Sequence, residues 1–586
     1  MNSPRIESVV FTNTARCRDC WRCVRVCPVK AIAVHDGQAA VVADRCISCG
    51  SCIRECPQNA KAYRNDVEGV KALLMDRENV AISLAPSFAA FYSPVHYQKL
   101  PTALRLLGFS FVAETAVGAY HSALASREWI SKHRKGLSIG SACPAVVRYV
   151  ELYRPELTEH LIDVPSPMAL HADLCRKRLG KNSGFVFVGP CVAKKYEAGR
   201  DGISNLVDFA LTFEELDGWM ASEKIDLSAL ADSHFDELPG GSARLYPLAG
   251  GMLKTADLPT DMLSCGHTAV SGFENLKDAL SACGDGQQVV EALFCRDGCI
   301  NGPAKTGSYT PVARRQNLIR YYERRAAYTD DSLEWNGNDG DPGSELQFAG
   351  TEISELEIQT VLEATGHADE VDQLNCAACG YNSCRDRAVA VVLGLAERDM
   401  CIPFMRRLAE QRSDRIMESS PNGIVILDSH LNILFMNPTF QRFFKCFNSS
   451  AGRRINFLMD PGPFEKLTTG ETDMVEMTVN HKRFGLVCHQ ICYTLKDEGQ
   501  YVGIFVNITG QLSSEEKLAT LRAQTVSQVR ELFAHQLSVA EQLAGFLGES
   551  TARGEVLVDT LLKLADEDSD ERTTDGGRLW NIFTSK

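Results

Sequence analysis

The stretches CRDCWRCVRVCP (17–28) and CISCGSCIRECP (46–57) repeat one pattern, C-x2-C-x2-C-x3-C-P, in tandem. In such a run, three thiolates hold one 4Fe-4S cluster and the fourth is a ligand of the neighbouring cluster. This rule predicts one cluster on Cys17, Cys20, Cys23 and Cys56, and a second on Cys46, Cys49, Cys52 and Cys27. Structural zinc fits separate C-x2-C pairs but not eight cysteines in this order.

The same run is typical of bacterial ferredoxins, so residues 1–66 are expected to form a ferredoxin-like α+β domain. The chain has 586 residues, which is too long for one hydrophobic core and predicts several domains. Its formal net charge of −14 argues against nucleic acid as the main partner, because phosphate binding needs clustered Lys and Arg.

The sequence contains no run of about 18 apolar residues, and its first residues lack the apolar core of a signal peptide. We therefore expect no membrane span and a cytoplasmic location. The 22 cysteines of such a chain favour metal binding over disulfides. Those without a predicted ligand role are expected to be buried or semi-buried thiols: Cys175, Cys265, Cys283, Cys446, Cys488 and Cys492.

Residues 67–325 have an α/β pattern. Apolar runs at 79–87, 136–144, 184–191 and 289–295 are predicted strands, and Thr212 with Glu215 forms a predicted capping box for a helix between them. Each run ends in Pro or Cys at its carboxyl end, where open α/β sheets bind ligands. We therefore expect one crevice, and one more 4Fe-4S cubane, at Cys143, Cys191, Cys295 and Cys299.

A Gly-, Asp- and Asn-rich stretch, NGNDGDPGS (336–344), indicates a linker, placed at residues 326–350. After it, a small Fe-S module is predicted at residues 351–408. Its four thiols form a compact cage for a further 4Fe-4S cluster, with zinc as the alternative: Cys376, Cys379, Cys384 and Cys401.

Residues 409–510 alternate strands with a helix that begins near Asn437 and Pro438. The motifs NGIVILD, ILFMNPTF and GIFVNITG resemble those of an α+β PAS sensor domain. Residues 511–586 begin with a helical seam that includes Val529, Leu532 and Val539, which predicts a signalling helix able to form a homodimer. A helix packed on its own PAS domain is the alternative for this helical tail.

Three segments resemble, in order, the active-site signatures of the iron-only (FeFe) hydrogenases: SACP at Cys143, GPCVAKKYE at Cys191, and FCRDGCINGP at Cys295. The resemblance covers roughly residues 1–325 and implies a two-lobed α/β catalytic-type domain at 67–325. The whole chain is therefore expected to be a multidomain α/β protein.

The resemblance also implies an H-cluster. In this site the four cysteines would hold a 4Fe-4S cubane, and Cys299 would bridge it to a diiron subcluster with CO, cyanide and a dithiolate. Lys194 would donate a hydrogen bond to one cyanide, and Pro86 and Ser87 would approach the other. Glu197 would either pair with a lysine or be solvated. Three further 4Fe-4S clusters would lie outside the active site.

Several positions depart from the family pattern. Ala142 stands where efficient enzymes have a second cysteine that relays protons, and Ala125 and Ser126 stand where paired glutamates are expected. Gly189 and Leu293 replace methionines. Another departure is that Arg296-Asp297 precedes Gly298 where the family prefers x-Gly-Gly. Because acid-base relays contribute about 10²–10⁴ in rate, we expect a slow catalyst.

These departures are similar to the sensory subgroup of the family, which also carries an extra Fe-S module and a PAS domain. The sequence predicts an H2 or redox sensor with slow reversible H2 oxidation and proton reduction. A ferredoxin-coupled hydrogenase and a non-catalytic Fe-S assembly-type protein are the alternatives. Expected partners are H2 and protons, ferredoxin or a similar electron carrier, hydrogenase maturation proteins, and a separate signalling kinase or phosphatase.

Overall fold

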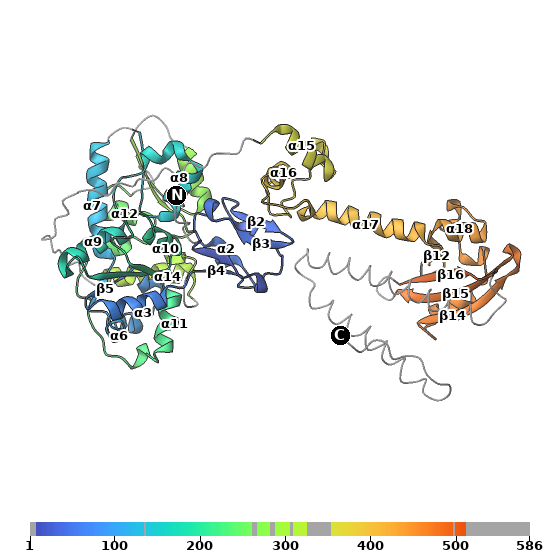
Figure 1. The fold of residues 1–586 in the computed structure, drawn as a ribbon, viewed down its shortest axis with the longest axis horizontal. Coiled ribbons are helices and arrows are strands. Elements are labelled where there is room, and N and C mark those ends of the chain that lie inside the picture. Colours follow the sequence, from blue (N-terminus) through green and yellow to red (C-terminus); the bar gives the residue numbers. More distant parts are fainter. Residues whose placement is uncertain are drawn as a thin grey trace. The chain divides into compact units, whose positions relative to one another are not determined.

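The computed structural model describes residues 8–133, 136–260, 266–281, 287–304, 307, 309–324, 353–495 and 499–510 (Figure 1). The predicted linker at 326–350, the predicted tail at 511–586, and Cys265 and Cys283 lie outside these residues. The chain forms two compact units, which divide between Arg398 and Asp399. None of the helices in the described part of the chain is both long enough and apolar enough to cross a membrane.

The N-terminal domain has two small antiparallel sheets. One pairs β1 (Val10–Thr12) with β4 (Lys61–Tyr63), and the other pairs β2 (Ile32–His35) with β3 (Gln38–Val41). Each cysteine run contains a five-residue helix. It is α1 (Arg22–Val26) in the first run and α2 (Ser51–Glu55) in the second. The turn between β2 and β3 has positive φ at Asp36 and Gly37, as a tight hairpin requires. This arrangement agrees with the predicted α+β architecture.

The central α/β domain contains two parallel sheets. The first has the order β6-β5-β8-β9, formed by Phe111–Glu114, Val80–Leu84, Gly184–Gly189 and Phe209–Thr212. The second has the order β10-β11-β7, formed by His267–Ser271, Gln287–Leu293 and Gly136–Ile139. The four predicted strands are β5, β7, β8 and β11. Because the strands of each sheet are parallel, their carboxyl ends lie along one edge of that sheet.

Helices cover these sheets in Figure 1. They are α3 (Val67–Asp76), α4 (Phe88–Phe91), α5 (Pro94–Tyr97), α6 (Leu100–Leu106), α7 (Ala116–Lys132), α8 (Pro144–Tyr153), α9 (Pro167–Leu179), α10 (Ala193–Ala198), α11 (Phe213–Ser222), α12 (Gly251–Thr255), α13 (Phe273–Ser281) and α14 (Pro311–Arg324). The predicted capping box of α11 is confirmed, since the Glu215 amide donates to Thr212 Oγ1 and the Thr212 amide donates to Glu215 Oε2. Strand β5 is buried along its whole length, as expected inside a parallel sheet.

The C-terminal module, residues 353–398, belongs to the first unit. It consists mainly of α15 (Glu355–Ala364) and α16 (Cys384–Val392). These helices share a small core of Ile358, Val361, Leu362, Cys384 and Ala388. Such a core is small for independent stability, which is consistent with a module that depends on a cluster and on its neighbours.

The second unit begins with α17 (Ile402–Ser419) and contains an antiparallel sheet in the order β13-β12-β16-β15-β14. Its strands are Ile433–Met436, Gly423–Leu427, Gln500–Asn507, Leu486–Leu495 and Met474–His481, and its shorter helices are α18 (Pro438–Phe444) and α19 (Gly462–Thr468). Asn437 caps α18 through its side-chain oxygen, at the predicted helix start. Helix α17 continues through residues 408 and 409, where the sequence suggests a domain boundary, because no Pro or Gly interrupts it there.

Candidate iron-sulfur and diiron site

The thiols of the tandem repeat gather into two groups. Cys20 and Cys17 add to the effect of burial in raising the pKa of Cys23, so these three lie together. Cys27 instead lies beside the second run, because burial, Cys49 and Cys46 together raise its pKa to about 12. This placement supports the crossed ligand assignment. We call Cys27, Cys46, Cys49 and Cys52 the inner group. Cys17, Cys20 and Cys23, with Cys56 as their predicted fourth member, are the outer group.

Four other thiols converge from three loops of the central domain. Cys143 precedes α8, Cys191 follows β8, and Cys295 and Cys299 follow β11. Burial raises the pKa of Cys295 strongly, and Cys191, Cys299 and Cys143 add to that rise in this order. Four thiols so close in a buried place support the predicted four-cysteine site.

Local backbone geometry explains Gly298, the residue before Cys299. Its φ is +80°, and a Cβ atom at this position would lie 2.3 Å from the carbonyl oxygen of Pro247. The amide of Cys299 donates to that same carbonyl at 2.8 Å. Only glycine fits such a close approach. Asp297, at a position where the family prefers glycine, has φ of 65°, a region that aspartate tolerates better than most residues.

Lys194 lies on α10, behind Cys191, in a buried polar cluster. Its Nζ lies 2.7 Å from Glu197 Oε2 and donates to Ser166 Oγ at 3.1 Å and to the Ala142 carbonyl at 3.4 Å. Ser166 donates to the other Glu197 oxygen. Glu197 is therefore not a solvated residue, and its predicted pairing with a lysine is confirmed. The ammonium is held beside the Ala142–Cys143 backbone.

Pro86 and Ser87 follow the carboxyl end of β5 and are both buried. The Ser87 hydroxyl has no hydrogen-bond partner among the described residues. Buried hydroxyls are nearly always hydrogen-bonded, so this one is available to a bound group. The predicted role of Ser87, a second polar contact for the diiron group, stays a prediction.

The donor set fits a thiolate-held iron site. Burial raises the pKa of Cys191 to about 12, with Cys143 adding to the rise, so a thiolate is favoured there only when a metal cation offsets its charge. The Lys194 ammonium lies beside the backbone of Ala142 and Cys143, where it is available to an anionic ligand. No three His, Cys, Asp or Glu side chains in the described part of the chain stand at the spacing of a single bound metal ion.

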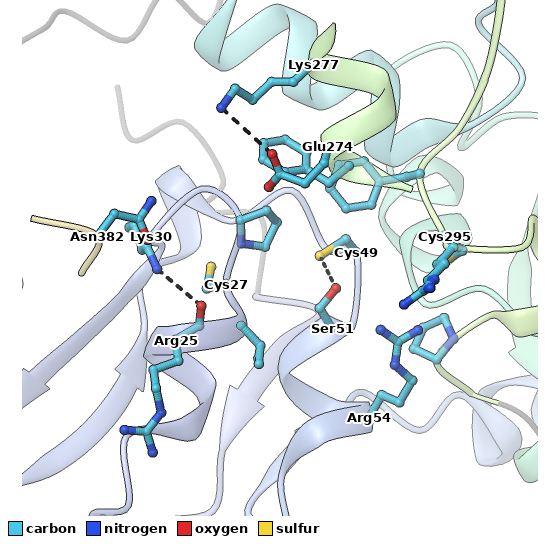
Figure 2. Close-up of a pocket in the computed structure, with 16 residues that line it drawn as sticks. Arg25, Cys27, Lys30, Cys49, Ser51, Arg54, Glu274, Lys277, Cys295 and Asn382 are labelled. Atoms are coloured by element: carbon cyan, nitrogen blue, oxygen red, sulfur yellow. Dashed lines mark hydrogen bonds and ion pairs between the residues drawn. The ribbon is translucent and has the colours of Figure 1, made fainter. Parts of the chain in front are cut away.

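A pocket of about 280 Å³ lies where the N-terminal domain, the central domain and the C-terminal module meet (Figure 2). Its lining includes Cys27 and Cys49 of the inner group, Cys295 of the central site, and Asn382 of the module. Cys143 contributes to the raised pKa of Cys49, after burial, so the inner group borders the central thiols. One cavity thus adjoins two predicted cluster sites.

Helix α8 connects the central site to the inner group. The guanidinium of Arg148 donates to the Cys46 carbonyl at 2.7 Å and lies over the Tyr196 ring, 4.1 Å from its centroid. The Tyr153 hydroxyl donates to the Arg45 carbonyl at 2.7 Å. The helix that begins after Cys143 therefore also positions the loop of Cys46.

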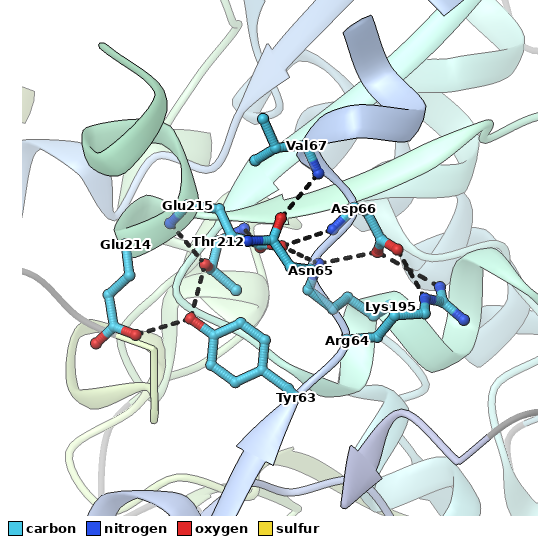
Figure 3. A network of polar contacts seen from close by, with 9 residues as sticks. All are labelled: Tyr63, Arg64, Asn65, Asp66, Val67, Lys195, Thr212, Glu214 and Glu215. Carbon is cyan, nitrogen blue, oxygen red and sulfur yellow. Dashed lines mark hydrogen bonds and ion pairs between the residues drawn. The ribbon is translucent and has the colours of Figure 1, made fainter. Parts of the chain in front are cut away.

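A second buried network anchors the residue next to Lys194 (Figure 3). The Lys195 ammonium is fully buried and lies 2.9 Å from Asp66 Oδ2 and 2.8 Å from Glu215 Oε1. Asp66 comes from the end of the N-terminal domain, and Glu215 from α11. The network joins both domains at α10 and so positions the backbone that carries Lys194.

The residues in place of the family's proton relay contain no carboxylate. Ala125 and Ser126 lie on α7, and the buried Ser126 hydroxyl donates to the Ser122 carbonyl of its own helix at 2.7 Å. Ala142 offers only a methyl group beside Cys143. The predicted loss of relay groups at these positions is consistent with the geometry.

The predicted ligands of the C-terminal cage fall on both sides of the division between the two units. Cys376 is exposed, whereas Cys379 and Cys384 are buried in the first unit. Cys401 is buried in the second unit, immediately before α17. Cys175, Cys446, Cys488 and Cys492 are buried, as predicted for thiols without a ligand role.

The sequence did not identify Ser166, Lys195 or Arg148 as part of the site. Ser166 precedes Pro167, and this pair predicts the start of a helix. It does not predict which residues the Ser166 hydroxyl contacts. Lys195 follows Lys194, which is the one signal that could have drawn attention to it. The partners of all three come from other elements, so no spacing along the chain reveals them.

The chain matches four protein families. Residues 78–303 match the family described as iron only hydrogenase large subunit, C-terminal domain, and residues 9–57 match the 4Fe-4S dicluster domain. Residues 372–403 match a family named for an Fe-S cluster, and residues 411–472 match the PAS domain.

Three curated relatives show the range of similarity. The periplasmic Fe hydrogenase large subunit of Nitratidesulfovibrio vulgaris is 30% identical over 279 residues, which cover 42% of this chain and 66% of the relative. The NADP-reducing hydrogenase subunit HndD of Solidesulfovibrio fructosivorans is 25% identical over 362 residues, with 52% and 58% covered. The cytosolic Fe-S cluster assembly factor NAR1 of Kluyveromyces lactis is 26% identical over 184 residues, with 28% and 38% covered.

The alignments thus cover less than two thirds of each relative's length. A solved FeFe-hydrogenase HydA1 from Chlamydomonas reinhardtii aligns with 46% of this chain and 90% of its own, at 19% identity and a TM-score of 0.37. The chain therefore contains a domain of the iron-only hydrogenase large-subunit family, preceded by a 4Fe-4S dicluster domain and followed by a PAS domain.

Proposed function

We propose that this protein is a sensor of H2 or of redox state, built on a slow FeFe-hydrogenase site whose signal leaves through the PAS domain. Ala142 is the observation that carries the proposal. It lies next to Cys143 and within reach of the Lys194 ammonium through its carbonyl, but its methyl group cannot carry a proton. Loss of a terminal relay is compatible with sensing, which needs few turnovers, and not with fast catalysis.

The remaining residues retain the capacity to hold the H-cluster. When bound, this group would supply the chemistry that interconverts H2 with two protons and two electrons. Cys143, Cys191, Cys295 and Cys299 would hold it as thiolates, and Cys299 would also bridge to the diiron part. Lys194, oriented by Glu197 and Ser166, would donate a charge-assisted hydrogen bond to an anionic ligand. Ser87 would offer its free hydroxyl to another.

Two 4Fe-4S clusters would occupy the inner and outer groups of the N-terminal domain, and a third would occupy Cys376, Cys379, Cys384 and Cys401. These sites would exchange electrons with a ferredoxin-like carrier and deliver the redox state of the central site to the second unit. A change in cluster charge could then bias a PAS domain with two arrangements. A separate kinase or phosphatase would read the PAS domain.

The similarity to the assembly factor NAR1 favours a second candidate, a non-catalytic Fe-S assembly-type protein. Two observations weigh against it. The buried Lys194–Glu197 pair and the free Ser87 hydroxyl would serve anionic ligands, which a site limited to a cubane does not have. The PAS match also favours signalling.

Infrared spectroscopy of anaerobic protein, produced together with hydrogenase maturation proteins, tests this function. We expect CO and cyanide bands together with H2 turnover far below that of efficient hydrogenases. Absence of these bands would exclude both hydrogenase functions and leave the assembly-type protein. Bands with turnover near that of efficient enzymes would overturn the sensor and support a ferredoxin-coupled hydrogenase.

A further inference from the structure

The C-terminal module is docked on the N-terminal domain beside the cysteine repeat. Lys30 Nζ donates to the Gly380 carbonyl at 2.7 Å, and Arg25 Nη1 donates to the Ala378 carbonyl at 3.0 Å. Gly380 has φ of +95°, and a Cβ atom there would lie 3.2 Å from the Arg25 amide nitrogen. The loop between Cys379 and Cys384 therefore lies directly against the first cysteine run.

A second contact lies at the carboxyl end of the module, at Leu395 and Glu397. The Glu397 carboxylate accepts hydrogen bonds from the Asp36 and Gly37 amides at the turn between β2 and β3. The Val34 amide donates to the Leu395 carbonyl at 3.0 Å. Two separate attachments, one in the loop at Ala378 and Gly380 and one at Leu395 and Glu397, orient the module on the N-terminal domain.

The first attachment brings two predicted cluster sites together. Lys30 Nζ also donates to the Val24 carbonyl at 3.1 Å, and Lys30 and Cys27 line the same pocket as Asn382 of the module. The Lys30 ammonium lies 5.8 Å from the centroid of the Tyr381 ring. Lys30 and Tyr381 thus lie near the inner group and the module at once.

The opposite side of the inner group adjoins the central site. Cys49 and Cys295 line the same pocket, and Asn382 of the module lines it as well (Figure 2). The inner group therefore has a neighbour on each side: the central thiols next to Cys49, and the module next to Cys27.

We propose that the inner group, Cys27, Cys46, Cys49 and Cys52, is a three-way electron junction that connects the central site, the outer group and the C-terminal module. Lys30 is the positioning residue of the branch to the module. Clusters held by the inner group and by the module cysteines would exchange one electron in this branch, from the inner group to the module, with no bond formed or broken. The inference rests on the cluster content of the proposed function but not on its H2 chemistry.

The outer group is the competing attachment point. Arg25 also donates to the Cys20 carbonyl at 2.8 Å, so the backbone of the outer group is near the module. Cys27 and Cys49 of the inner group, however, line the same pocket as Asn382 of the module, whereas none of the outer-group cysteines is among the residues that line it. Electron transfer depends on the distance between clusters, which sit at the thiols, and the thiol positions favour the inner group.

The first test uses the full chain, reduced with dithionite without H2, and measures magnetic splitting between clusters by EPR. In Cys20→Ser, which removes the outer cluster, the splitting between the inner and module clusters should persist. Adding Cys376→Ser, which removes the module cluster, should abolish it. Loss of this splitting in Cys20→Ser alone would overturn the proposal. Because H2 is absent, this outcome is separate from the infrared test of the hydrogenase site.

The second test covers the case in which Cys20→Ser loses more iron than one cluster holds. Lys30→Met removes a cation beside two clusters, so the midpoint potentials of the inner and module clusters should both fall in a redox titration, while that of the outer cluster stays. Lys30→Arg should restore both potentials. A shift confined to one of the two clusters, or no shift, would overturn the proposal.

A matched control lies in the same cysteine-run segment of the N-terminal domain as Lys30. Arg22 of α1 is exposed and pairs with Glu55 at 2.8 Å. Arg22→Gln removes a cation from the N-terminal domain without removing a contact to the module. Arg22→Gln should leave the midpoint potentials of the inner and module clusters unchanged. This result would show that the effect of Lys30→Met is local and not the result of a lower net charge.

Discussion

The Lys194 ammonium lies 2.7 Å from Glu197 Oε2, one helical turn later in α10, and both side chains are buried. Glu197→Gln would leave the ammonium without its counter-charge, and breaking such a buried pair costs about 3–5 kcal/mol. We expect the lysine to turn away, so that CO and cyanide bands are lost while cubane iron is retained. Infrared spectra and iron counts check this. The control is Glu156→Gln, which breaks an exposed pair with Arg154. Unchanged bands in Glu197→Gln would contradict the role of Glu197 in orienting Lys194.

Ala142→Cys should raise H2 turnover without a change in cluster content. The new thiol would stand beside Cys143, where a proton relay can contribute about 10²–10⁴ in rate. Ala142→Ser is matched in size but carries a much less acidic group, so it should give a smaller rise. H2 evolution with reduced methyl viologen measures both. An unchanged rate in Ala142→Cys would show that a step farther out limits proton transfer.

Lys195→Met should strongly destabilise the first unit. It would break both buried ion pairs of Lys195 and leave Asp66 with its remaining pair to Arg64, a loss of about 3–5 kcal/mol. The thermal unfolding midpoint under anaerobic conditions reports the change. Lys71→Met, at a more exposed lysine that pairs with Glu68, should leave the midpoint nearly unchanged. Equal midpoints in both variants would show that the network of Figure 3 adds little stability.

Glu291 should make stability depend on pH. Burial raises its pKa from 4.5 to about 7, although the Leu253 and Met252 amides act to lower it. The folded state thus keeps a proton that the unfolded state releases, so the free energy of unfolding falls by about 3 kcal/mol as pH rises from 4.5 to 7. Glu291→Gln should remove this part of the slope in anaerobic thermal unfolding. The exposed Glu78→Gln should keep it, and equal slopes in all three proteins would contradict the assignment.

Cysteine spacing carried most of what could be predicted. The tandem repeat predicts which thiols share a cluster, and the structure places Cys27 beside Cys49 and Cys46 of the second run. The buried strands were also readable, since β5 and β8 are continuous apolar runs that end at Pro or Cys. The capping box of Thr212 and Glu215 is purely local and was predicted in full.

Long-range polar contacts could not be predicted. Lys195 and Asp66 are 129 positions apart, and Lys30 and Gly380 are 350 apart, so no local pattern links them. The continuation of α17 through residue 408 was also missed, because a domain boundary leaves no mark inside an uninterrupted helix. Glu197 remained open between two states, and its burial beside Lys194 decided between them.

The sequence by itself determined the order of the domains and the sets of thiols, because ligand spacing and strand hydrophobicity act over short stretches of chain. Only the tertiary structure decided which sets adjoin each other. The inner group borders both the central site and the module because Cys49 and Cys27 face different neighbours on the folded N-terminal domain. These groups adjoin because elements far apart in the chain pack together. The polar contacts that hold them, made by Lys30, Arg148 and Lys195, all reach residues distant in sequence.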